Sequence, residues 1–146
     1  MKQVLFLCSA NYYRSRFAEH FFNWLAEANG TRWRAASRGL AVGRWGHIPG
    51  MSRYTVDRLR ACGVPLLETR DPQQLSEDDL ARADLTIALK EGEHRQMVGE
   101  LFPHWVDRVE YWQIDDLDCA EPEDALPILE DRLRALAERL RDGHGL

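Results

Sequence analysis

The chain has 146 residues, of which 45% are hydrophobic and 29% charged, a composition typical of a folded globular protein. This length suffices for one core and is short for two ordinary domains, so we expect residues 1–146 to form a single domain. The formal net charge of −5 argues against a nucleic-acid partner, because domains that bind nucleic acid are usually basic.

The sequence also lacks the signals of a membrane or secreted protein. No apolar run approaches the roughly 20 residues that a bilayer-spanning helix needs. The apolar stretch Val4–Leu7 is too short for a signal peptide, and no small-residue cleavage site follows it. We therefore expect a cytoplasmic protein with no membrane partner.

The first half of the chain shows alternating strand and helix patterns. The apolar run Val4–Leu7 predicts a buried strand, and apolar spacings of three to four predict a helix over residues 14–29 that Gly30 ends. A second strand is predicted at Arg32–Ser37. A glycine-rich connection, Gly39–Gly50, follows it.

The middle of the chain continues the alternation. A helix is predicted over residues 51–61, and Ser76 with Asp79 forms the pattern of a capping box that opens a short helix. Asp84–Leu89 predicts a third strand. A further helix is expected over residues 91–101.

The C-terminal part adds a fourth strand, Val109–Ile114, and a long helix. Five leucines lie on one face of this helix: Leu126, Leu129, Leu133, Leu136 and Leu140. Strand and helix thus alternate throughout, which predicts an α/β fold with a parallel sheet between two layers of helices.

The loop after the first predicted strand carries the chemistry. A thiol at Cys8 would lie at the N-terminus of a helix, where free N–H groups and positive potential favour the thiolate, the nucleophilic form. Five residues separate Cys8 from Arg14, enough for the backbone to curl around a tetrahedral anion that the guanidinium would close off. Asn11 tolerates the left-handed conformation that such a curl needs, and the hydroxyl of Ser15 could donate to the sulfur. The residues expected to bind phosphate here are Ser9, Ala10, Asn11, Tyr12, Tyr13 and Ser15.

The stretch Val4–Glu19 resembles the low-molecular-weight protein tyrosine phosphatases, whose N-terminal loop reads C-x-G-N-x-C-R-S before a helix with an Ala-Glu pair. Weaker similarity extends over nearly the whole chain, including Ser37–Gly39 and Ala83–Leu85. The resemblance implies a four-stranded parallel sheet of order 2-1-3-4, in three layers. It also implies a reaction without metal or cofactor, through a phosphocysteine, on a phosphorylated protein or a small aryl phosphate.

That chemistry requires an acid to protonate the leaving oxygen. In the family this acid is an aspartate, usually followed by proline, on the loop after the fourth strand. The corresponding stretch here is Trp112–Asp118, and its register favours Asp116 as the acid, with Asp115 as the alternative and Asp118 third. No proline follows any of these aspartates.

Two loop residues depart from the family pattern: Ala10 replaces the glycine, and Tyr13 replaces the second cysteine. A disulfide within the loop is therefore excluded. The other cysteines are Cys62, interpreted as structural, and Cys119, which is either an unreactive loop residue or a partner for oxidised Cys8.

Trp45, in the glycine-rich connection, is a candidate for the rim of the substrate site, with burial in the core as its alternative. Tyr12 could belong to the same wall. Its aromatic ring, like that of Trp45, could stack on a phenyl group.

Other functions fit parts of the pattern. Thioredoxin-coupled arsenate reductases resemble the same fold and loop but need two further cysteines, and residues 86–91 contain none. An arsenate reductase that uses a small external thiol remains an alternative. A non-catalytic phosphoprotein-binding module is another, although Cys8, Ser15 and a suitable aspartate are all present.

Overall fold

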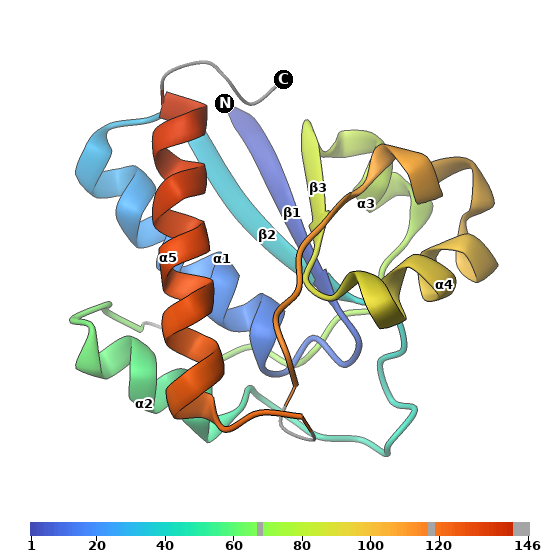
Figure 1. Cartoon of the computed structure of the whole chain (residues 1–146), viewed down its shortest axis with the longest axis horizontal. Coiled ribbons are helices and arrows are strands. Elements are labelled where there is room, and N and C mark those ends of the chain that lie inside the picture. Colours follow the sequence, from blue (N-terminus) through green and yellow to red (C-terminus); the bar gives the residue numbers. More distant parts are fainter. Residues whose placement is uncertain (67–68, 117–118, 142–146) are drawn as a thin grey trace.

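The structure is a computed structural model that describes residues 1–66, 69–116 and 119–141. Four parallel strands form its centre (Figure 1). Their order across the sheet is β2-β1-β3-β4, which confirms the expected topology. All neighbouring strands pair in parallel, so their carboxyl ends meet at one edge of the sheet. The strands are β1 (Lys2–Cys8), β2 (Trp33–Gly39), β3 (Leu85–Ala88) and β4 (Glu110–Tyr111).

Helices cover both faces of the sheet, as the α/β interpretation expected (Figure 1). On one face lie α1 (Arg14–Asn29), α2 (Arg53–Ala61) and α5 (Pro122–Arg141). On the other lie α3 (Glu77–Arg82), α4 (Glu91–Leu101) and a 3₁₀ helix, η1 (Pro103–Arg108). No helix in the described part of the chain is long and apolar enough to cross a membrane.

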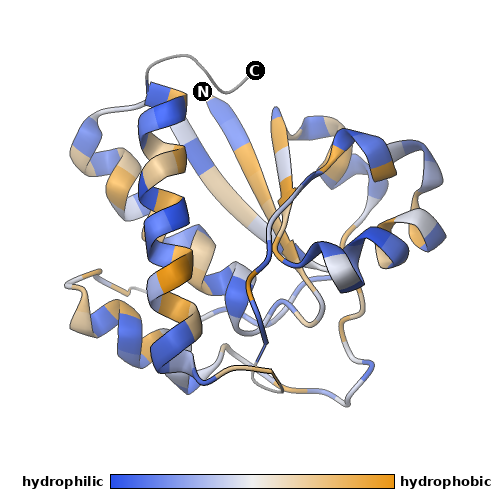
Figure 2. Ribbon diagram, in the orientation of Figure 1, coloured by the Kyte–Doolittle hydropathy of each residue, from blue (hydrophilic) through white to orange (hydrophobic). Residues whose placement is uncertain are grey.

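The alternation of side chains along β1 builds two cores. Val4 and Phe6 face α1 and α5, where the ring of Phe6 meets that of Phe22 edge-on at 6.1 Å. Leu5 and Leu7 face the opposite layer. The central strands are accordingly the most continuously hydrophobic part of the ribbon in Figure 2, whereas the helices carry apolar stripes. The five leucines predicted to share one face of the terminal helix are all buried.

Helix α2 begins two residues later than the sequence pattern indicated. Ser52 has a non-helical backbone, with φ −52° and ψ 134°, and its Oγ accepts a hydrogen bond from the backbone N–H of Tyr54 at 3.2 Å. Serine is a strong N-cap because its side chain satisfies such an amide. Met51 therefore precedes the helix and is buried.

The fourth strand is much shorter than predicted, because its regular parallel pairing with β3 ends at Tyr111. Trp112 still donates to the carbonyl of Ala88 at 2.9 Å, but Gln113 forms an antiparallel bridge with Lys90, beyond the end of β3. Ile114 and Asp116 thereby contact Arg14, at the carboxyl edge of the sheet where the loop of residues 9–13 follows β1.

Candidate active site

The loop after β1 curls over a glycine of the neighbouring strand. Asn11 has φ 53° and is the one non-glycine residue with positive φ in the described ranges. Gly39, which pairs with Cys8 across β1 and β2, lies directly beneath it. A Cβ on Gly39 would approach the Cβ and the backbone N of Asn11 to 3.0 Å, and Val42 to 2.5 Å. The curl therefore depends on glycine at position 39, whereas Ala10 needs no left-handed backbone.

Asn11 is fully buried, and its side chain makes four hydrogen bonds. Its Nδ2 donates to Ser15 Oγ at 2.9 Å and to Ser37 Oγ at 3.0 Å. Its Oδ1 accepts from the backbone N–H of Gln73 at 3.0 Å and from Arg70 Nη1 at 3.1 Å. An asparagine amide has two donors and two acceptor lone pairs, so all its capacity is used. The side chain thus fixes the left-handed residue from both sides.

Ser15 lies against the sulfur of Cys8, with 2.9 Å between Oγ and Sγ. Because Ser15 already accepts a hydrogen bond from Asn11, its single hydroxyl proton remains for the sulfur. Both residues are buried. The geometry therefore suits donation from Ser15 to a thiolate at Cys8, as expected from the sequence.

The guanidinium of Arg14 is buried and held from several directions. Nη1 donates to the carbonyl of Ile114 at 3.1 Å, and Nη2 contacts Glu93 at 3.0 Å and Asp116 at 3.2 Å. Burial alone would lower the pKa of Arg14, but its electrostatic interactions with Cys8, Asp116 and Glu93 outweigh burial and raise the pKa. Its Nε is buried and has no hydrogen-bond partner among the described residues. The side chain is thus a fixed cation with an N–H left for an anion.

Helix α1 begins at Arg14, immediately after the loop. Its N-cap residue is Tyr13, whose side chain makes no capping hydrogen bond within the part of the chain that the structure describes. The first amides of a helix have no intrahelical carbonyl partner, and together with the helix dipole they favour an anion. The first turn also contains no acidic residue. This end of α1 therefore favours an anion next to Cys8.

A second buried arginine, Arg16, ties the loop to its surroundings and was not anticipated from the sequence. It donates to the carbonyls of Asn11 at 3.3 Å, Gly50 at 3.2 Å and Arg70 at 2.6 Å. Burial, with the nearby charge of Arg70, lowers its pKa to about 10, so it remains a cation at neutral pH. Arg16 thus adds positive charge behind the loop while joining three segments of the chain.

A cavity of about 410 Å³ opens over Cys8. Tyr12 and Trp45 form part of its wall; Trp45 is 59% exposed and lies at the rim rather than in the core. Ile48, which was not predicted, adds an apolar side chain to the same wall. The full lining consists of Cys8, Ala10, Tyr12, Tyr13, Arg14, Trp45, Ile48 and Asp116.

Of the two candidate acids that the structure describes, Asp116 lines this cavity and contacts Arg14. Asp115 is directed elsewhere, because its carboxylate pairs with Lys90 Nζ at 2.8 Å. Asp118 lies outside the described residues. Cys119 is exposed and contacts Lys90 Nζ at 3.6 Å, while Cys8 is buried.

Three further side chains of the site were missed from the sequence: Glu93, His94 and Arg70. Glu93 and His94 lie in the first turn of α4, and helices that follow parallel strands begin at the edge where Cys8 lies. That topological signal could have identified them. Ser9 bonds to both, through its Oγ, at 2.9 Å from Glu93 Oε1 and 3.1 Å from His94 Nε2. Arg70 lies in an irregular segment, for which no periodic pattern exists.

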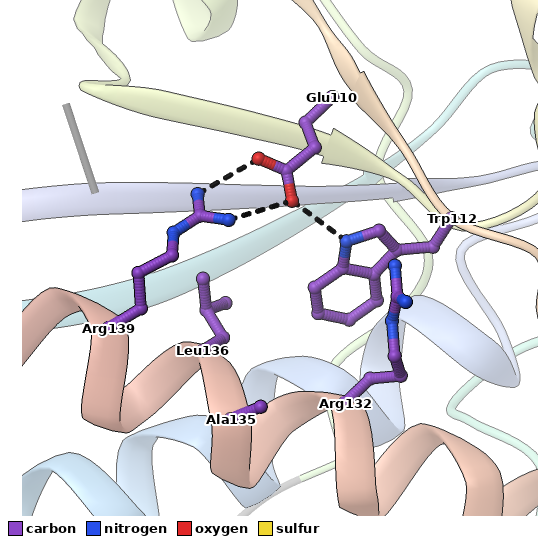
Figure 3. A pocket seen from close by; sticks show the side chains of 6 residues that line it. All are labelled: Glu110, Trp112, Arg132, Ala135, Leu136 and Arg139. Carbon is purple, nitrogen blue, oxygen red and sulfur yellow. Dashed lines mark hydrogen bonds and ion pairs between the residues drawn. The ribbon is translucent and has the colours of Figure 1, made fainter. Parts of the chain in front are cut away.

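A second cavity, of about 210 Å³, lies between the end of the sheet and α5 (Figure 3). Its charged groups already have partners: Arg139 makes two hydrogen bonds to the carboxylate of Glu110, and the guanidinium of Arg132 lies 4.8 Å from the ring centroid of Trp112 (Figure 3). No cysteine, serine or histidine is among its described lining residues. The cavity at Cys8 is therefore the candidate active site.

A buried thiol at the start of a curled loop, between the first strand and the first helix of a parallel α/β sheet, is the arrangement expected of a class of phosphatases that use cysteine. The family model described as low molecular weight phosphotyrosine protein phosphatase matches residues 3–144. The chain belongs to this family and is a cysteine-dependent phosphatase. No match was found among curated proteins.

Solved structures show the same fold. A low molecular weight protein tyrosine phosphatase from T. tengcongensis is 24% identical, with a TM-score of 0.78 and coverage of 98% of this chain and 99% of that chain. Wzb from Vibrio vulnificus, in complex with benzylphosphonate, is 19% identical, with a TM-score of 0.81 over 94% and 98% of the two chains. The YwlE arginine phosphatase from Geobacillus stearothermophilus is 21% identical, with a TM-score of 0.72 over 98% and 92%.

Proposed function

We propose that this phosphatase hydrolyses phosphotyrosine or another aryl phosphate monoester, with Cys8 as nucleophile, Arg14 as phosphate ligand and Asp116 as general acid. The observation that carries the proposal is the single cavity in which these three side chains meet beneath Tyr12 and Trp45. The residues come from β1, α1 and the segment after β4, which the parallel topology brings to one edge.

The reaction proceeds in two steps. The Cys8 thiolate attacks phosphorus in line, while Arg14 and the amides at the start of α1 stabilise the charge on the equatorial oxygens. Asp116 gives its proton to the departing phenolate, and then accepts a proton from the water that hydrolyses the phosphocysteine. Ser15, whose Oγ lies 2.9 Å from the sulfur, donates a hydrogen bond that stabilises the thiolate leaving in the second step.

The cavity wall favours an aromatic leaving group. Beyond Cys8, Arg14 and Asp116, the lining is formed by alanine, isoleucine and aromatic side chains, which suit the face of a phenyl ring. A phosphorylated guanidinium, the group named for the YwlE arginine phosphatase, would place a polar fork against the same apolar surface. We therefore propose aryl phosphates, on a protein or a small molecule, as the preferred substrate class.

Rapid mixing with para-nitrophenyl phosphate tests the function directly. We expect a burst of nitrophenolate, stoichiometric with enzyme, wherever hydrolysis of the phosphocysteine is slower than its formation. Acid quenching followed by mass spectrometry should place one phosphate group on the peptide that contains Cys8. Hydrolysis with the phosphate trapped on no cysteine would contradict the proposed mechanism.

The Asp116→Ala variant should slow hydrolysis of phosphotyrosine by about 10²-fold, because the phenolate must then leave without a proton. The loss should be smaller with para-nitrophenyl phosphate, whose leaving group needs less protonation. Steady-state kinetics on the two substrates measure this difference. Asp115→Ala is the matched control, since that carboxylate pairs with Lys90. Equal losses in both variants would remove Asp116 from this role.

We also propose that residues 1–146 act as one domain in the cytoplasm. One sheet organises the whole fold, and the family match spans residues 3–144. A reducing compartment would keep the nucleophilic thiol of Cys8 active, and the three cysteines are free.

A further inference from the structure

Three hydrogen-bond donors converge on one oxygen of Glu93, at the edge of the proposed active site. Oε1 accepts from Arg14 Nη2 at 3.0 Å and from Ser9 Oγ at 2.9 Å, and it lies 2.9 Å from His94 Nε2. Hydrogen bonds from these groups, first from His94 and then from Arg14, hold the pKa of Glu93 well below its usual range, although burial opposes them. Glu93 is therefore a carboxylate at neutral pH.

The neighbouring His94 fixes this carboxylate rather than acting as a base. Its Nδ1 accepts the backbone N–H of Lys90 at 3.0 Å, so the neutral ring carries its proton on Nε2. Burial lowers the pKa of the fully enclosed ring, which remains neutral at pH 7. Nε2–H is consequently a donor toward Glu93 and Ser9, and it cannot take a proton from the serine.

The clamp on Arg14 has two sides. The carbonyl of Ile114 holds Nη1, and Nη2 contacts two carboxylates, that of Glu93 at 3.0 Å and that of Asp116 at 3.2 Å. Two fixed contacts on different nitrogens define the plane of a guanidinium, because the group is rigid. The unpartnered Nε then has a set direction.

We infer that Glu93 is a positioning residue for the phosphatase reaction: it orients Arg14 for the transition state and does not contribute to ground-state anion binding. This inference rests on the proposed function. Its chemical basis is that a carboxylate near the site weakens anion binding in general, whereas an oriented guanidinium strengthens binding of the transition state in particular.

Glu93→Gln tests the inference, because glutamine keeps the size and one acceptor but removes the charge. We expect kcat to fall about tenfold and the Ki of orthovanadate, a transition-state analogue, to rise by a similar factor. The Ki of inorganic phosphate should stay within about threefold of wild type, or decrease, because one repelling charge is lost. If Glu93 served only folding, the variant would have a lower melting temperature, and the Ki values of vanadate and phosphate would change by the same factor.

Glu91→Gln is the matched control on the same helix. Glu91 pairs with Arg95 at 3.1 Å on the exposed surface, so this variant should match wild type in all three constants. The inference is overturned if Glu93→Gln behaves like Glu91→Gln, or if it weakens the binding of phosphate and of vanadate equally. In either case an active wild-type enzyme leaves the proposed function standing. Inactive wild-type protein would overturn both.

If Glu93→Gln fails to fold, Ser9→Ala carries the test, since it removes one donor to the carboxylate. In Ser9→Ala we expect a smaller loss of kcat and a smaller rise in the Ki of vanadate, again with little change in the Ki of phosphate. Unchanged kcat and vanadate Ki in Ser9→Ala would overturn the inference.

Discussion

Replacement of Cys8 by serine is expected to abolish turnover of para-nitrophenyl phosphate, with a loss of about 10⁴-fold or more in kcat. A serine hydroxyl is a much weaker acid and a much poorer nucleophile than a thiol, so the attack on phosphorus loses its nucleophile. The loop between β1 and α1 should persist, because Asn11 and Arg14 hold it through contacts that do not involve the sulfur. Steady-state kinetics and a phosphate-binding titration would show activity lost and binding retained.

Cys62→Ser is the matched control for this prediction. Cys62 is the C-cap of α2, and burial raises the pKa of its thiol, so it remains protonated and inert. Its variant should keep wild-type activity. Substantial turnover in Cys8→Ser, or loss of turnover in Cys62→Ser, would contradict the assignment of the nucleophile.

Arg14→Lys should be nearly as damaging, with kcat lower by about 10³-fold despite the retained positive charge. Lysine is a single point charge, whereas the bound guanidinium contacts Ile114 and Glu93 and still has Nε available. The lysine variant cannot make the two-pronged contact that the equatorial oxygens of the transition state require. Kinetics with para-nitrophenyl phosphate, together with the Ki of orthovanadate, measure the effect.

Arg95→Lys controls for the substitution itself. Arg95 lies on α4, where its side chain is about half exposed and pairs with Glu91 and Asp107. This variant should retain wild-type rates, because exposed ion pairs contribute little. An Arg14→Lys enzyme within tenfold of wild type would show that charge, rather than guanidinium geometry, supports the reaction.

Much of the fold could be predicted because its elements follow simple periodic patterns. The helices Arg14–Asn29 and Glu91–Leu101 were predicted with the bounds that the structure has, and the capping box at Ser76 and Asp79 is present. The predictions are wrong where the end of an element depends on a pairing partner that is distant in the sequence. The strand at 109–114 shortened to Glu110–Tyr111 because Gln113 pairs with Lys90 instead of continuing along β3.

The candidate site divides in the same way. Cys8, Asn11 and Arg14 form a contiguous motif, so the sequence contains their spacing directly. Glu93 contacts Arg14, from which it is separated by 79 positions in the sequence, and Arg70 contacts Asn11 across 59 positions. No local pattern encodes contacts of this kind. The acid is an intermediate case: register favoured Asp116, and its place in the cavity agrees, although its role stays a proposal.

The four hydrogen bonds of Asn11 make the phosphate loop an integral part of the folded interior. The side-chain amide of Asn11 is hydrogen-bonded to Arg70, Ser37 and Gln73. The loop should therefore already have its anion-binding shape before any substrate arrives. Ligand capture then requires little backbone reorganisation, which favours rapid association. The same arrangement makes the loop unable to open alone, so its amides should exchange with solvent deuterium about as slowly as those of β1.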